Sequence, residues 1–170
     1  MKKTILAATI CAILLGCVAH AEPRPLIDFD NAAFNRARTA WEAQGITCYV
    51  FEASGAQWEP WLRITVAEGE VAGFEIIEDL WTTGEERIED FAHMRKTIPD
   101  VFGMIQDMYD TARAGVGSLS DGQFYFIDVT YNAERHFPEA VHGGIGSYTT
   151  PPPIGGGGRR FLIREFLPQE

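Results

Sequence analysis

The spacing of apolar residues predicts two main helices and six strands. Apolar positions recur three and four residues apart over 31–44, between a capping Asp30 and Gly45, and again from a capping Thr97 to Gly115. Elsewhere the period changes to two, which is typical of strands, and 86–95 has the pattern of a short helix. The predicted strands are 46–51, 61–66, 71–77, 123–131, 136–141 and 159–166.

The order of these elements is α-β-β-β followed by α-β-β-β. Each amphipathic helix must bury one stripe, so we expect an α+β fold with two main helices packed on one face of an antiparallel sheet. Bulky side chains on both faces of 123–131 indicate a central strand. Pro138 places the next strand at an edge or at the point where the chain enters the sheet. Residues 30–170 then form a single domain.

A secretory signal is predicted at residues 1–21, because a short cationic start precedes an apolar run too short for a permanent membrane helix. Two cleavage signals overlap there. Leu14 to Cys17 resembles a bacterial lipobox (14–17), which would make Cys17 a lipid-modified first residue. Residues 19–21 fit ordinary signal peptidase, which would release the chain from Glu22. We favour the lipoprotein, with 22–29 as a tether.

The positions of the three cysteines are compatible with cleavage at either site. Cys11 leaves with the signal and Cys17 is removed or lipidated, so Cys48 is the only cysteine of the folded domain. No intramolecular disulfide can form, and the alternation around Cys48 indicates a small apolar residue on a strand face rather than a reactive thiol.

The charge balance narrows the possible partners. The whole chain has a net charge of −10, and from Glu22 onward 12 Lys and Arg oppose 24 Asp and Glu. Such a surface repels nucleic acid and anionic lipid headgroups. We therefore expect no nucleic-acid partner, and contact with a membrane only through a lipid at Cys17.

Residues 142–160 are rich in glycine and proline. We expect them to form a long loop outside the core, either mobile or functional.

The sequence contains no recognisable catalytic or metal site. Regular strand geometry would hold His136 and His142 about 20 Å apart, too far for a shared metal. The chain lacks Gly-x-Ser-x-Gly and the glycine patterns that bind phosphates, and its many acids single out no pair. We expect no metal, no cofactor and no catalytic residue.

Exposed aromatic residues are the best candidates for recognition. Trp58 and Trp61 flank a predicted turn, Trp81 lies in an acidic stretch, and Tyr148 lies in the glycine-rich segment. Aromatic side chains in turns can anchor an interface or stack on sugars. The same side chains could instead cover the open edge of the sheet.

Several short segments resemble a family of bacterial secreted proteins and lipoproteins that is defined only as a domain of unknown function. The resemblance rests on Trp41 with 48–51, on 64–71, on 97–105 and on 129–141. It implies an envelope location and an α+β domain, with no activity to transfer. In shape the predicted architecture is also similar to PepSY-type and periplasmic inhibitor modules.

These observations together predict an exported, lipid-anchored, non-catalytic interaction module whose partner is an envelope protein. Two alternatives stay open. One is a small-ligand or glycan-binding protein that uses the same aromatic residues, and the other is a hydrolase with an unrecognised carboxylate site.

Overall fold

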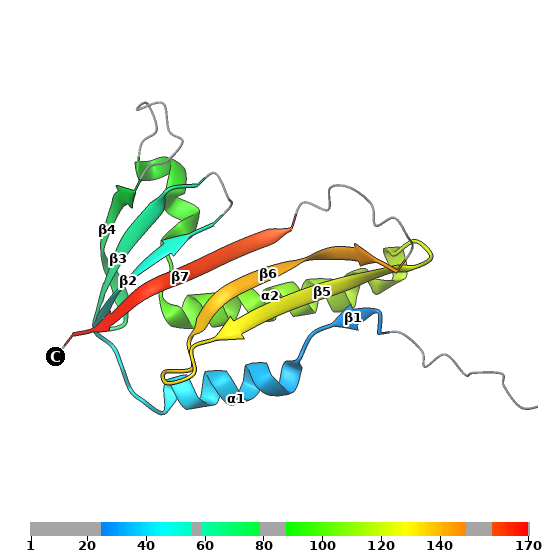
Figure 1. Ribbon diagram of the computed structural model, residues 1–170, viewed down its shortest axis with the longest axis horizontal. Helices are drawn as coiled ribbons and strands as arrows, with labels where there is room; N and C mark the ends of the chain where they lie inside the picture. The colour runs from blue at the N-terminus through cyan, green and yellow to red at the C-terminus, as the bar shows by residue number, and fades with distance from the viewer. Residues whose placement is uncertain (1–24, 56–58, 79–87, 149–157, 170) are drawn as a thin grey trace, which may run out of the picture.

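The computed structural model describes residues 25–55, 59–78, 88–148 and 158–169, which form an α+β fold (Figure 1). Seven strands make one mixed sheet in the order β1-β5-β6-β7-β2-β3-β4. In chain order the elements are β1 (Ile27–Asp28), α1 (Asn31–Glu42), β2 (Tyr49–Ser54), β3 (Trp61–Ala67), β4 (Glu70–Glu78), the 3-10 helix η1 (Ile88–Met94), α2 (Ile98–Gly115), the 3-10 turn η2 (Val116–Ser118), β5 (Gln123–Tyr131), β6 (Pro138–Ser147) and β7 (Arg159–Pro168).

The short strand β1 changes the expected topology. Ile27 and Asp28 pair in parallel with Tyr125 and Phe126 of β5. The sheet is therefore mixed, whereas the sequence predicts a wholly antiparallel sheet. Two residues are too few for a period-two pattern to be visible in the sequence. β5 lies second from the edge rather than in the centre, and among the described strands only β1 lies outside it.

Side-chain caps begin both main helices where the sequence predicts. The Asp30 carboxylate accepts a hydrogen bond from the backbone N–H of Ala33 at 2.8 Å. At α2, Thr97 Oγ1 accepts from Asp100 N at 3.2 Å, and Asp100 Oδ2 accepts from Thr97 N at 2.8 Å. This reciprocal pair is a capping box, which satisfies amide groups that a helix leaves without internal partners.

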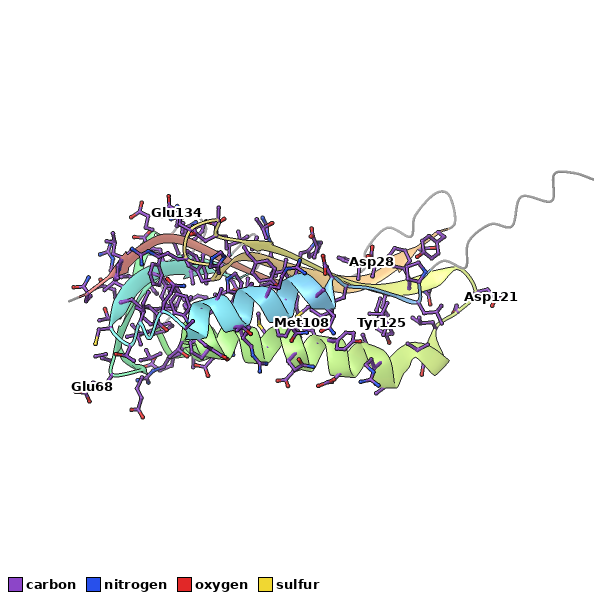
Figure 2. All side chains as sticks on the ribbon, turned by 90° about the horizontal axis from the view of Figure 1, so that it is seen from below. Asp28, Glu68, Met108, Asp121, Tyr125 and Glu134 are labelled. Carbon is purple, nitrogen blue, oxygen red and sulfur yellow. The ribbon has the colours of Figure 1, made fainter. Side chains whose placement is uncertain are left out.

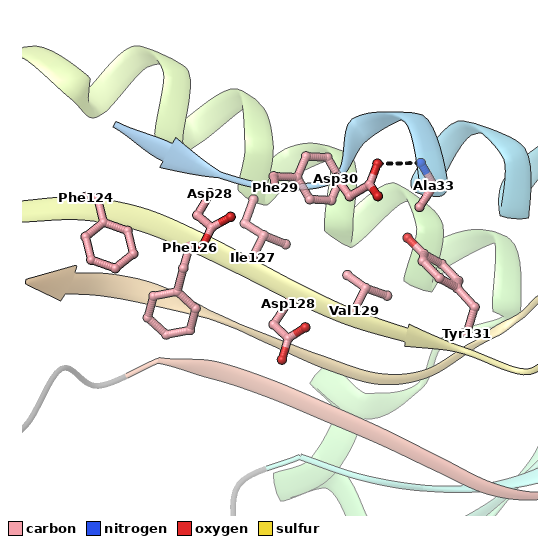
Figure 3. Close-up of a pocket in the computed structure, with 10 residues that line it drawn as sticks. All are labelled: Asp28, Phe29, Asp30, Ala33, Phe124, Phe126, Ile127, Asp128, Val129 and Tyr131. Atoms are coloured by element: carbon pink, nitrogen blue, oxygen red, sulfur yellow. Dashed lines mark hydrogen bonds between the residues drawn. The ribbon is translucent and has the colours of Figure 1, made fainter. Parts of the chain in front are cut away.

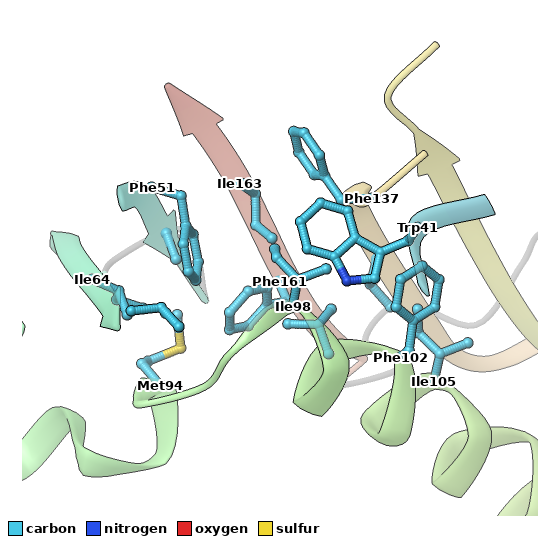
Figure 4. Packing of buried hydrophobic residues seen from close by; sticks show 14 of the residues in the cluster. Trp41, Phe51, Ile64, Met94, Ile98, Phe102, Ile105, Phe137, Phe161 and Ile163 are labelled. Atoms are coloured by element: carbon cyan, nitrogen blue, oxygen red, sulfur yellow. The ribbon is translucent and has the colours of Figure 1, made fainter. Parts of the chain in front are cut away.

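The core lies between the helices and the sheet face on which they pack (Figures 2 and 4). Trp41 of α1 makes edge-on contacts with Phe137 and Phe166, at centroid distances of 6.3 and 5.5 Å. Tyr49 Oη accepts a hydrogen bond from the backbone N–H of Ile98 at 2.9 Å, which joins β2 to the start of α2. The opposite face, called here the open face, has no helix among the described residues.

The strand β6 extends into the segment predicted as a loop. The glycine and proline content of 142–160 predicts a loop outside the core, yet 142–147 belong to a strand between β5 and β7, and Gly143 is buried. A Cβ at Gly146 would lie 2.5 Å from the ring of Phe124, so this glycine makes room for a neighbouring aromatic side chain. Pro138 is the first residue of β6 and therefore an entry point.

The signal segment 1–21, the first three residues of the tether (22–24) and residues 149–157 lie outside the described residues. In the part of the chain that the structure describes, no helix combines the length and apolar character needed to cross a membrane.

Candidate binding groove at the edge of the sheet

The structure does not bring the aromatic residues predicted for recognition into one surface. Trp58 and Trp81 lie outside the described residues, as does Cys17. Trp61 is the first residue of β3, whereas Tyr148 follows the far end of β6. The strand register places them three strands apart and offset by roughly 25 Å along the strands.

On the open face, Trp61 packs against Arg164, which belongs to a row of side chains with alternating charges. The Arg164 guanidinium lies 3.9 Å from the centroid of the Trp61 ring. Arg164 Nε donates to Glu52 Oε2 at 2.8 Å, and Arg63 Nη2 donates to Glu52 Oε1 at 3.0 Å. Arg63 Nη1 also donates to Glu75 Oε1 at 3.3 Å. The row therefore crosses β7, β2, β3 and β4 as cation, anion, cation, anion.

Glu52 is the centre of this row. Glu52 is 4% exposed although it lies on the open face, and both arginines contact its carboxylate. The hydrogen bond to Glu52 is the main cause of the raised pKa of Arg63. The charges of this row are paired, and a guanidinium covers the indole of Trp61. This part of the open face therefore presents paired charges rather than an exposed aromatic surface.

Tyr148 fastens the start of the described chain to the end of the sheet. Its ring stacks on Phe124 at a centroid distance of 4.3 Å and an interplanar angle of 18°. Its hydroxyl donates to the backbone oxygen of Pro25 at 2.9 Å. Tyr148 therefore has a role in holding the segment that leads into β1.

A groove of about 500 Å³ lies beside β5, where β1 ends and α1 begins (Figure 3). Its walls come from these three elements and from the segment that joins β1 to α1. The lining residues are Asp28, Phe29, Asp30, Ala33, Phe124, Phe126, Ile127, Asp128, Val129 and Tyr131.

The floor of the groove is the outer backbone edge of β5. Tyr125 N–H donates to the oxygen of Leu26 at 2.9 Å, so the odd-numbered residues of β5 direct their backbone groups towards β1. Pairing with β1 stops at Phe126, and the described chain then leaves to form α1. The Ile127 carbonyl and both backbone groups of Val129 therefore face the groove with no strand beside them among the described residues.

The two sides of this edge differ in chemistry. Ile127, Val129 and Tyr131 point towards the helices, whereas Asp128 lies on the open face. Asp28 is in register with Phe126 and shares its face, so it stands beside Asp128. The helix side of the edge is thus apolar, whereas the open side carries the carboxylates of Asp28 and Asp128 together with the rings of Phe124 and Phe126.

The hydroxyl of Tyr131 is buried and has no hydrogen-bond partner in the described structure. Burial raises the pKa of this phenol to about 12, and the negative charge of Asp30 acts in the same direction. Asp30 caps α1, so its carboxylate is held in place close to the groove.

Sequence reasoning missed this groove because it depends on pairing that ends early. The aromatic and apolar alternation of 123–131 identified the strand, but no local pattern shows how many residues of its neighbour pair with it.

Among the described residues, no three His, Cys, Asp or Glu side chains gather closely enough to hold a metal ion.

The groove thus offers three kinds of interaction. Backbone groups with no strand beside them among the described residues can hydrogen-bond another chain. The side nearer the helices can take apolar groups, and Asp28 and Asp128 can attract a cation. No protein-family model, curated protein or solved structure matches the chain, which leaves the resemblance to secreted proteins and lipoproteins a prediction.

Proposed function

We propose that the protein is an exported, non-catalytic binding module that takes up an extended segment of a partner protein as an added strand along β5. The observation that carries this proposal is the backbone edge from Ile127 to Val129, which lies at the floor of the groove without a described strand beside it. A peptide in extended conformation satisfies such groups with main-chain hydrogen bonds.

The side chains along this edge favour the same function. Proteins commonly block an open edge with proline, lysine or a bulge. Here Ile127 and Val129 flank the edge, and pairing with β6 is regular from Gln123 to Thr130, so the edge is straight over the segment that lines the groove. A neighbouring segment can therefore lie flat against it.

Substitutions at Val129 test strand addition, because the N–H of this residue faces the groove. Val129→Pro removes that donor while the even-numbered residues keep their bonds to β6, and Val129→Ala is the matched control that retains the donor. Linear peptides selected from a random display library on the wild-type protein serve as probes. We expect Val129→Pro to abolish their binding and Val129→Ala to retain most of it. Equal binding by both variants would contradict strand addition.

We further propose that the module works in the bacterial envelope, anchored through a lipid on Cys17. The cationic start, apolar run and lipobox of residues 1–17 support this location. Cell fractionation of Cys17→Ser tests the anchor. The variant should move from the membrane to the soluble fraction, and unchanged membrane association would argue against lipidation.

A second candidate function is binding of a small apolar ligand. A separate hollow of about 390 Å³ lies between α2 and the strands β5 and β6, with the cation of Arg159 at its margin. A bulky side chain introduced by Met108→Phe should reduce binding of the anionic dye anilinonaphthalene sulfonate there. A dye signal that is the same in this variant and in the wild type would remove the support for this candidate.

A further inference from the structure

We infer that the segment bound along β5 carries a basic side chain flanked by apolar side chains at alternate positions. This inference rests on the proposed strand addition and adds the chemical class of the partner. It follows from the register of β1 on β5 and from the different chemistry of the two faces of that edge.

The position opposite Asp128 determines the basic residue. An added strand continues the line of β1, in which Asp28 lies opposite Phe126. Two residues further along that line, a side chain of the bound segment lies opposite Asp128 and next to Asp28. Directly opposed side chains are about 5 Å apart at Cβ, and neighbours on the same face of one strand are about 7 Å apart. A lysine or arginine at this position would therefore meet two carboxylates.

These two carboxylates are available for such a contact. Asp28 and Asp128 are both exposed, and neither forms an ion pair with another described residue. On the neighbouring strand β6, His142 lies opposite Asp128. Its ring makes an edge-on contact with Phe126 at a centroid distance of 5.1 Å. The excess of acidic residues over the whole chain adds a long-range preference for a cationic partner.

The neighbouring positions of the bound segment face the helix side. The side chain opposite Val129 would enter the part of the groove lined by Val129, Tyr131 and Ala33. Burying an apolar side chain there is favourable, whereas a charge would lose water beside apolar atoms. The expected motif is therefore apolar, basic, apolar with a period of two.

Three matched peptides test this specificity. Each is a blocked, fluorescently labelled strand of alternating valine and a variable residue, which is lysine, glutamine or glutamate. Fluorescence polarisation should show the lysine peptide binding about tenfold more tightly than the glutamine peptide, which corresponds to about 1.4 kcal/mol. The glutamate peptide should bind more weakly than the glutamine peptide.

Variants of the protein separate the local contact from the overall charge. Asp128→Asn should reduce the advantage of the lysine peptide over the glutamine peptide and leave binding of the glutamine peptide unchanged. Asp121→Asn, which removes the same charge from an exposed turn before β5, is the matched control and should change neither. Added salt should weaken the binding of the lysine peptide but not that of the other two peptides.

The possible results distinguish this inference from the function on which it rests. Equal binding of all three peptides, with loss in Val129→Pro, would overturn the basic preference and leave strand addition in place. An equal effect of Asp128→Asn and Asp121→Asn would also overturn it. Absence of binding by every peptide, together with no difference between Val129→Pro and Val129→Ala towards library peptides, would overturn both.

Discussion

The guanidinium of Arg164 stacks on the ring of Trp61 at 3.9 Å, while its Nε donates to Glu52 at 2.8 Å. The two contacts fix the plane of the guanidinium and its direction together. A tryptophan that the sequence suggested for recognition is therefore part of an ionic row that stabilises the open face of the sheet.

Glu52→Gln should destabilise the fold by about 2 kcal/mol, because hydrogen bonds to a charged group contribute about 1.5–3 kcal/mol. The Glu52 side chain is 5% exposed and accepts from two arginines, whose own side chains remain about 40% exposed and can be hydrated after the change. Urea denaturation measures the effect. Glu75→Gln is the control, since the Glu75 side chain is 63% exposed and an exposed pair contributes about 0.5 kcal/mol. Equal effects of the two substitutions would contradict the central role of Glu52.

The free energy of unfolding should decrease as the pH rises from about 10 to 12. Burial raises the pKa of Tyr49 and of Tyr131 to about 12 in the folded protein, against 10.0 for a free tyrosine. Between these values the unfolded chain has lost the phenolic protons that the folded chain keeps, so the stability is fully present below pH 10 and is lost as the pH rises through 12. Urea titrations at several pH values across this range measure the slope, and Tyr131→Phe should make it shallower. A slope that is the same in the variant would argue against this contribution.

The same substitution at the two tyrosines should change stability in opposite directions. Tyr131→Phe removes a buried hydroxyl that has no partner among the described residues and should stabilise the protein by about 1 kcal/mol. Tyr49→Phe leaves the Ile98 N–H without its acceptor and should destabilise by about 1 kcal/mol. Thermal or urea denaturation near neutral pH, where both phenols are protonated, gives the two values. Destabilisation by Tyr131→Phe would indicate a hydrogen bond from this hydroxyl.

The sequence predicts elements whose signal is local and misses features that depend on pairing. Asp30 and Thr97 identified the helix starts because a cap and its amide lie within three residues. The α+β class followed from the change of period along the chain. The groove could not be predicted, because it exists only where β1 stops pairing with β5 after Asp28.

The glycines of β6 predict a loop where a strand forms, for a related physical reason. Gly143 and Gly146 resemble residues of a flexible loop, yet in β6 they accommodate Met108 and Phe124, which reach them from other elements. A glycine selected for close packing and one selected for chain flexibility are identical in sequence. Only the neighbours across the sheet distinguish the two cases.

Gly146→Ala should therefore destabilise the protein by about 1–3 kcal/mol, the usual cost of forcing an extra group into occupied space. A Cβ at this position would lie 2.5–3.1 Å from three atoms of the Phe124 ring, and stacking on Tyr148 restrains that ring. Gly103→Ala is the matched control. Beyond the local backbone of α2, a Cβ at Gly103 would have no described atom within 4 Å, and alanine favours helix over glycine by about 0.5–1 kcal/mol, so this variant should be more stable than the wild type. Urea denaturation of the two variants and of Gly146→Ala/Phe124→Leu decides the cause. Recovery in the double variant would assign the loss to the ring contact, whereas a loss that persists without Phe124 would point to the backbone of β6 itself.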